Sequence, residues 1–131
     1  MAFVSGFGVA AARLAAPDAG LLSFAEVADQ AACIAEAGRS PLETAAAAAA
    51  AAPPPPPLPL IVDADTGYGS EINVRRTIQA FAREGFAGML VEDQAWPKSC
   101  GHVGAKTVVP RDDAVRRCGM ASRCEVGSGH I

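Results

Sequence analysis

The stretch LIVDADTGYG, residues 60–69, contains the strongest fold signal in this chain. It begins with a wholly apolar run, Leu60 to Val62, and continues into the acids Asp63 and Asp65. An apolar run without polar alternation is typical of a strand that is buried on both faces of a parallel sheet. We therefore predict a strand over residues 60–65, followed by a turn.

The residues after this stretch continue the same pattern. A helix is predicted to begin after the N-cap residue Ser70 and to end at Gly85. A second apolar strand over 86–91, a polar loop over 94–109 and a helix over 112–117 follow. This order of elements predicts an α/β fold with a parallel sheet. The apolar face of the first of these helices is expected to be Val74, Ile78 and Phe81.

The residues before residue 60 predict one strand end and two helices. Residues 3–6 resemble the end of a strand, and residues 9–14 are expected to form a short helix. A longer helix should begin after Ser23, because Glu26 three residues on completes a capping box. Its predicted stop is Gly38.

Composition divides the chain into four segments. Residues 1–39 and 60–117 carry the strand and helix patterns, whereas residues 40–59 are an alanine- and proline-rich tract of low complexity. That tract is predicted to be an unpacked spacer, because it offers little to bury against the entropy of ordering. A rival role as a ligand for a proline-reading domain lacks any flanking signal. Residues 118–131 are glycine- and serine-rich and are expected to form an unstructured tail.

Charge and cysteine content exclude several classes of function. The net charge of −3 gives no basic footprint for nucleic acid, and we expect neither a nucleic-acid nor a membrane partner. The apolar N-terminus has no basic residue before it, so no signal peptide is predicted. The four cysteines form no C-x-x-C pair, which favours reduced thiols in an intracellular protein of unknown compartment.

Acidic residues follow both predicted strands at their carboxyl ends. Asp63 and Asp65 are two positions apart, so on a strand their carboxylates would point to the same side. Two such charges in one cleft repel unless a cation lies between them, and oxygen-only ligands suit Mg²⁺ or Mn²⁺. Glu92 ends the next strand and could join this site. A helix-capping role for Asp65 is the alternative, and these residues alone leave both open.

The loop residues Lys98-Ser99-Cys100-Gly101-His102 form a second candidate site. Lys98 and His102 flank the thiol of Cys100, and nearby cations lower a thiol pKa toward neutrality, as an acid or base requires. Gly101 permits close approach of the backbone to a ligand. An ordinary loop with a buried cysteine is the alternative interpretation.

Five motifs occur together in one order: VSGFG (4–8), LAAPDAGLLS (14–23), DADTGYG (63–69), VEDQ (91–94) and PKSCGH (97–102). In this combination the chain resembles the isocitrate lyase/phosphoenolpyruvate mutase superfamily, especially its methylisocitrate lyases and plant-type carboxyphosphonoenolpyruvate mutases. The resemblance implies a (β/α)₈ TIM barrel. Because such a barrel needs about 200–250 residues, this chain would hold a fragment of it, roughly strands 2 to 4, with 40–59 as a low-complexity insertion.

The resemblance also implies roles for particular residues. Ser5, Gly6 and Phe7 would bind a substrate carboxylate, with Gly101 also near the substrate. The metal ligands would be Asp63 and Asp65, joined by Asp18 and Glu92. Cys100 would be the catalytic acid, with Lys98 and His102 beside it.

The implied activity is Mg²⁺-dependent carbon–carbon cleavage of a 2-hydroxy or 2-oxo di- or tricarboxylic acid, of the isocitrate, methylisocitrate or alkylmalate type. Ser99 stands where isocitrate lyases have a second basic residue, which argues against strict isocitrate specificity. A phosphorus–carbon mutase and a non-catalytic remnant or interaction protein remain alternatives. The resemblance implies a homo-oligomer for the full-length family, and we expect this partial chain to be inactive alone.

Overall fold

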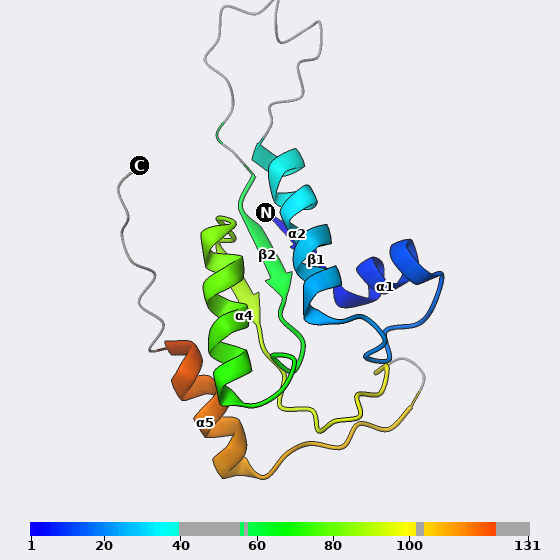
Figure 1. Cartoon of the computed structure of the whole chain (residues 1–131), viewed down its shortest axis with the longest axis vertical. Coiled ribbons are helices and arrows are strands. Elements are labelled where there is room, and N and C mark those ends of the chain that lie inside the picture. The colour runs from blue at the N-terminus through cyan, green and yellow to red at the C-terminus, as the bar shows by residue number, and fades with distance from the viewer. Residues whose placement is uncertain (40–55, 57, 102–103, 123–131) are drawn as a thin grey trace, which may run out of the picture.

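The computed structural model describes residues 1–39, 56, 58–101 and 104–122. Its centre is a three-stranded parallel sheet in the order β1-β2-β3. Helices α2 and α4 lie side by side on one face of this sheet (Figure 1). The strands are β1 (Ala2–Val4), β2 (Leu60–Asp63) and β3 (Gly88–Leu90), and the helices are α1 (Gly6–Leu14), α2 (Phe24–Arg39), α4 (Glu71–Arg83) and α5 (Arg111–Ser122).

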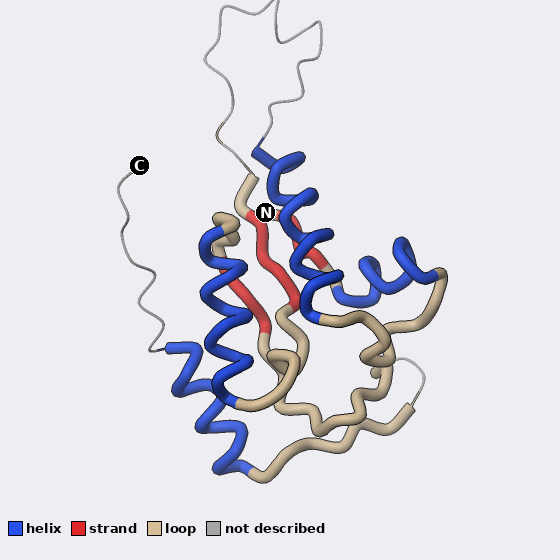
Figure 2. Tube along the Cα trace, in the orientation of Figure 1, coloured by secondary structure: helices blue, strands red, loops and turns tan. Residues whose placement is uncertain are grey.

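The parallel pairing confirms the predicted α/β arrangement. Val62 of β2 pairs with Val4 on one side and with Met89 on the other, and both ladders run parallel. Along the chain, α1 and α2 connect β1 to β2, and α4 connects β2 to β3; Figure 2 draws the helices in blue and the strands in red. All three strands therefore end at the same edge of the sheet.

Strand β2 is shorter than predicted, because it ends at Asp63 and not at Asp65. The backbone of Asp65 has a φ of 55°, in the left-handed region, which an extended strand does not allow. Backbone pairing with the segment that follows β3 nevertheless continues, since the Glu92 amide donates to the Asp65 carbonyl at 2.8 Å. The expectation that both acids lie on a regular strand was therefore wrong for Asp65.

The predicted helix starts at Ser23 and Ser70 are confirmed, but the predicted stop at Gly38 was wrong, because Gly38 lies within α2, which continues to Arg39. The Ser23 amide donates to Glu26 Oε2 at 2.8 Å, and the Glu26 amide donates back to Ser23 Oγ at 3.4 Å. Ser70 caps α4, where its amide donates to Asn73 Oδ1 at 3.0 Å. Gly85 ends α4 with a φ of 82°.

The core lies between the sheet and the two helices α2 and α4. Val62 and Phe81 are fully buried, and the predicted apolar face of α4 points inward. Phe81 packs between Phe24 and Phe86, at ring-centroid distances of 6.2 and 5.8 Å. Burial of each large side chain contributes about 1.5–3 kcal/mol, so this aromatic cluster holds both helices to the sheet.

The ends of several predicted segments differ from the structure. Strand β3 covers only Gly88–Leu90 of the predicted 86–91, and β1 ends at Val4 and not at residue 6. Helix α1 begins at Gly6, three residues before the predicted start, and α5 continues to Ser122. Residues 118–122 of the expected tail are therefore helical, while 123–131 lie outside the described residues, as does all but a few residues of the tract 40–59. Within the described chain, no helix has the length and apolar character needed to cross a membrane.

Candidate active site

The predicted site residues gather where the three strands end. Ser5 follows β1, Asp63 ends β2, and Glu92 lies two residues beyond β3. In parallel α/β folds this carboxyl edge is where binding and catalytic groups are placed. The local strand and turn geometry thus brings residues from distant parts of the sequence to one place.

A cavity of about 280 Å³ opens at this edge. Eight of the predicted site residues line it: Ser5, Phe7, Asp18, Asp63, Glu92, Lys98, Cys100 and Gly101. Gly6 and Asp65 lie beside it through direct contacts with Asp63 and Lys98. His102, the remaining predicted residue, lies outside the described residues.

Lys98 occupies the centre of the acidic cluster. Its ammonium lies 2.8 Å from Asp18 Oδ2, 2.9 Å from Asp65 Oδ1 and 3.7 Å from Glu92 Oε1, and its side chain is only 4% exposed. Burial opposes the charge, but the hydrogen bonds to the two aspartates outweigh it and raise the pKa of Lys98. The lysine predicted as a neighbour of the thiol therefore serves here as the counter-ion of the carboxylates.

Asp63 is held by backbone amides. The Gly6 amide donates to Asp63 Oδ2 at 3.2 Å, and the Asp65 amide donates to Asp63 Oδ1 at 3.0 Å. A Cβ at Gly6 would come within 2.9 Å of Asp18 Oδ2 and 3.1 Å of Asp63 Oδ2. A side chain at position 6 would therefore displace the Asp18 carboxylate and crowd that of Asp63.

The carboxylates do not form a finished metal site. Among the described residues, no group of three or more histidine, cysteine or acidic side chains is arranged to hold a metal ion. The donor set of Asp18, Asp65 and Glu92 nevertheless converges on one cation, the Lys98 ammonium, and supplies only oxygen atoms. Such donors fit the chemistry of Mg²⁺ or Mn²⁺, provided that the ammonium leaves the position it holds.

The Cys100 thiol is buried and lines the same cavity as Lys98 and Lys106. The predicted close approach at Gly101 is made by a side chain of the protein, because a Cβ there would lie 2.6 Å from Lys106 Cε. The thiol, which is the candidate acid or base, therefore lies in the same cavity as the acidic cluster and two lysine side chains.

Two residues at this site were missed by sequence reasoning. Gln94, only 1% exposed, accepts from the Ser99 amide at 2.6 Å and donates to Glu92 Oε2 at 3.3 Å. Lys106 donates to the same Glu92 oxygen at 3.0 Å. Burial raises the pKa of Glu92, but the two lysines outweigh it and hold that pKa below its usual value. Gln94 belongs to the VEDQ motif, which was a usable signal, whereas nothing in the loop sequence marks Lys106.

The chain is similar to known proteins. The family model described as phosphoenolpyruvate phosphomutase matches residues 2–128. The petal death protein of Dianthus caryophyllus is 43% identical over 112 residues, which are 86% of this chain and 30% of that protein. The chloroplastic carboxyvinyl-carboxyphosphonate phosphorylmutase of Arabidopsis thaliana is 37% identical over 119 residues, 91% of this chain and 30% of that protein.

A solved structure of 2,3-dimethylmalate lyase, described as a PEP mutase/isocitrate lyase superfamily member, superposes with a TM-score of 0.75 at 32% identity. The superposition covers 92% of this chain and 35% of that one. This chain thus spans about a third of the length of the relatives it matches.

Proposed function

The chain belongs to the PEP mutase/isocitrate lyase superfamily, and from this premise we propose that it carries part of the active site of a carbon–carbon lyase. The proposed substrates are 2-hydroxy or 2-oxo di- or tricarboxylic acids. One observation carries the proposal: carboxylates from three loops converge on one cation beside the Cys100 thiol, at the carboxyl edge of a parallel sheet.

We infer that Asp63, Asp65, Asp18 and Glu92 would hold Mg²⁺ or Mn²⁺. When bound, such an ion acts as a Lewis acid toward the oxygens of a 2-oxo acid and stabilises enolate charge. Gln94 and Lys106 fix the position of Glu92. The ammonium of Lys98 has to move aside first, so ion binding and the position of the loop over 94–101 would be linked.

The remaining residues have roles toward the substrate. The start of α1, with Ser5 and Phe7, lies at the cavity, and amides at a helix N-terminus attract a carboxylate. Cys100 would transfer the thiol proton to the carbon left negative when the carbon–carbon bond breaks, and become a thiolate. Lys98 and Lys106 line the same cavity. His102 retains its proposed place beside the thiol.

The chain would supply roughly strands 2 to 4 of a barrel, from 1–39 and 60–117. In the described sheet, β1 and β3 each have a single neighbour. Catalysis needs groups held to about 0.5 Å, which an open sheet does not secure. We therefore expect no turnover from this chain alone.

A phosphorus–carbon mutase is the second candidate, favoured by the likeness to a phosphorylmutase at 37% identity. It would use the same acidic cluster, while a lyase depends on the thiol. Cys100→Ser separates the two.

The test is a chimera in which this chain replaces the matching third of 2,3-dimethylmalate lyase. Cys100→Ser is expected to lower release of the 2-oxo acid by about 10²–10⁴-fold, the usual contribution of a positioned acid, while Cys33→Ser on the exposed face of α2 leaves it unchanged. Calorimetry should show Mg²⁺ and oxalate binding retained in Cys100→Ser and lost in Asp63→Asn. A fully active Cys100→Ser chimera would refute the lyase assignment.

A further inference from the structure

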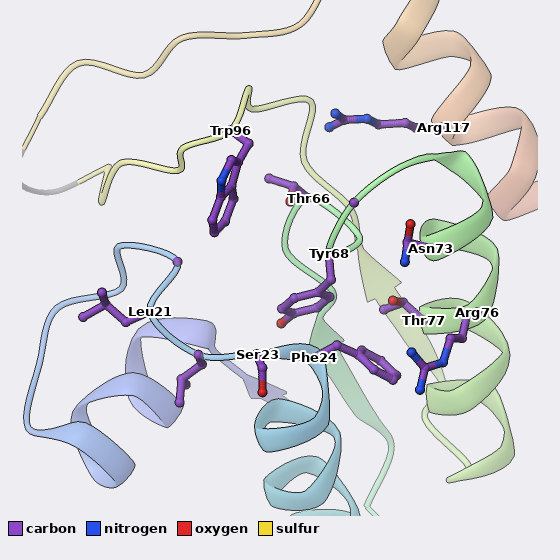
Figure 3. Close-up of a pocket in the computed structure, with 13 residues that line it drawn as sticks. Leu21, Ser23, Phe24, Thr66, Tyr68, Asn73, Arg76, Thr77, Trp96 and Arg117 are labelled. Atoms are coloured by element: carbon purple, nitrogen blue, oxygen red, sulfur yellow. The ribbon is translucent and has the colours of Figure 1, made fainter.

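A second and larger cavity, which we call the Trp96 pocket, lies outside the candidate active site. Its volume is about 530 Å³, within the range of about 300–1,000 Å³ usual for small-molecule sites. Figure 3 shows it between the loop that carries Leu21, the start of α2, the turn before α4, and α5. It shares none of its lining residues with the cavity at Cys100.

The charged groups of the Trp96 pocket are all positive. Arg76 of α4 and Arg117 of α5 line it, and no carboxylate does so among the described residues. Arg76 stacks on the Phe24 ring, 4.7 Å from its centroid, and Arg117 donates to the Gln94 carbonyl at 3.2 Å. Neither guanidinium has an acidic partner among the ion pairs of the described chain. In a chain of net charge −3, this pocket is a local site of positive charge.

The other walls of the pocket are aromatic and apolar. Phe24 and Tyr68 pack edge to face at 5.6 Å, and Trp96 stands opposite them at the opening (Figure 3). The residue Trp96 is 67% exposed, and Leu21 beside it is 61% exposed. Indole rings are costly to leave in water, and an exposed one at the mouth of a cavity offers a stacking surface.

The position of Trp96 is set by Gly20. A Cβ at Gly20 would meet two carbons of the indole ring at 2.8 and 3.0 Å, and Gly20 has a φ of 69°. The indole ring therefore packs directly on the Gly20 backbone, in the space that a side chain at this position would take. This packing aims the indole at the pocket through a specific contact between two loops.

We propose that the Trp96 pocket binds a small organic anion with a ring-sized apolar body, such as an aryl phosphate or aryl carboxylate. Arg117, on the Trp96 side of the pocket in Figure 3, binds the anionic group through charge-assisted hydrogen bonds, and the ring stacks against Trp96 and Tyr68. This second ligand site is independent of the proposed lyase chemistry. It recognises both features of its ligand, the charge and the ring.

The single tryptophan of the chain makes the test direct, because Trp96 is the only source of tryptophan emission. The 131-residue protein is titrated with phenyl phosphate, phenol and inorganic phosphate while that emission is followed. Phenyl phosphate is expected to change the emission saturably, with an affinity at least about tenfold above that of phenol or phosphate, because each lacks one recognised feature.

Matched arginine variants locate the binding. Arg117→Met should weaken phenyl phosphate binding by at least about tenfold, whereas Arg111→Met, exposed on the same helix, should not change it. Asp63→Asn should also leave it unchanged, so failure here and failure of the proposed lyase site are distinguishable. Equal binding of all three probes, wild-type affinity in Arg117→Met, or a protein without a cooperative thermal transition would each overturn the proposal.

Discussion

Lys98 and Asp18 are 80 positions apart in the sequence, and their charged groups lie 2.8 Å apart. The contact joins the loop after β3 to the loop after α1, across the carboxyl edge of the sheet. Because Asp65 also contacts this ammonium, one lysine ties together the loops that follow α1, β2 and β3. The acidic cluster and the loop that carries Cys100 are therefore one unit, with consequences for stability and metal binding.

Lys98→Met is expected to destabilise the chain by about 3–5 kcal/mol, the cost of leaving buried charges without a partner. The adjacent carboxylates would then repel one another. Added Mg²⁺ should raise the free energy of unfolding of this variant more than it raises that of the wild type. Urea titrations with and without Mg²⁺ measure both effects.

Lys106→Met is the matched control, because that side chain is about half exposed and also contacts Glu92. Its expected cost is clearly smaller than that of Lys98→Met, because water screens an exposed ion pair. Equal losses of unfolding free energy in the two variants would show that the buried ion pairs of Lys98 stabilise the chain no more than the exposed one of Lys106.

The cysteines are expected to differ in reactivity toward iodoacetamide. Cys33 and Cys118 are exposed and should be alkylated first, whereas Cys100 is buried and should react slowly until denaturant is added. Peptide mass spectrometry at timed intervals gives the three rates. Faster alkylation of Cys100 than of Cys33 in the folded protein would contradict the buried position.

Gly67→Ala should cost about 2–4 kcal/mol, from overpacking and a strained backbone together. Gly67 has a φ of 83°, and an added Cβ would lie 2.3 Å from Val74 Cγ2 and 3.0 Å from its Cα. Gly8→Ala is the control, since a Cβ there meets nothing within 4 Å and alanine favours a helix. A stable Gly67→Ala protein would mean that the turn over 66–69 is built differently.

The Glu26 carboxylate makes part of the stability depend on pH. Hydrogen bonds from the Ser23 backbone and side chain lower the pKa of Glu26 below its ordinary value of 4.5. A lowered folded-state pKa gives stability that is present above pH 4.5 and is lost as the pH falls through the folded-state value. The difference in melting temperature between wild type and Glu26→Gln should follow this course.

Glu36→Gln, near the other end of α2, controls for the loss of one negative charge. A Glu26→Gln difference that stays constant down to pH 2 would contradict the charged capping box.

The sheet and its helices could be predicted because their signals are local. Val74, Ile78 and Phe81 repeat at helical spacing, and Ser23 and Ser70 mark helix starts within three or four residues. The gathering of Asp63 and Glu92 followed from one further rule, that parallel strands end at the same edge. These inferences need no knowledge of how distant side chains pack.

The position of Lys98 could not be predicted in this way. Sequence proximity to Cys100 suggested a role at the thiol, but the conformation of the surrounding loop decides where the Lys98 ammonium lies. In that loop Gln94 forms an antiparallel bridge with Val108, and its side chain accepts a hydrogen bond from the Ser99 amide. The Trp96 pocket was also missed, because Arg76 and Arg117 come from different helices and share no motif. In both cases tertiary contacts between loops decide where a long side chain ends.

Gly38 and Leu60 lie against each other, since a Cβ on Gly38 would meet Leu60 Cδ1 at 3.0 Å. The polypeptide therefore leaves α2 and enters β2 at neighbouring points in space. The contact also sets where β2 begins beside β1, because Leu60 is the residue that pairs with Ala2.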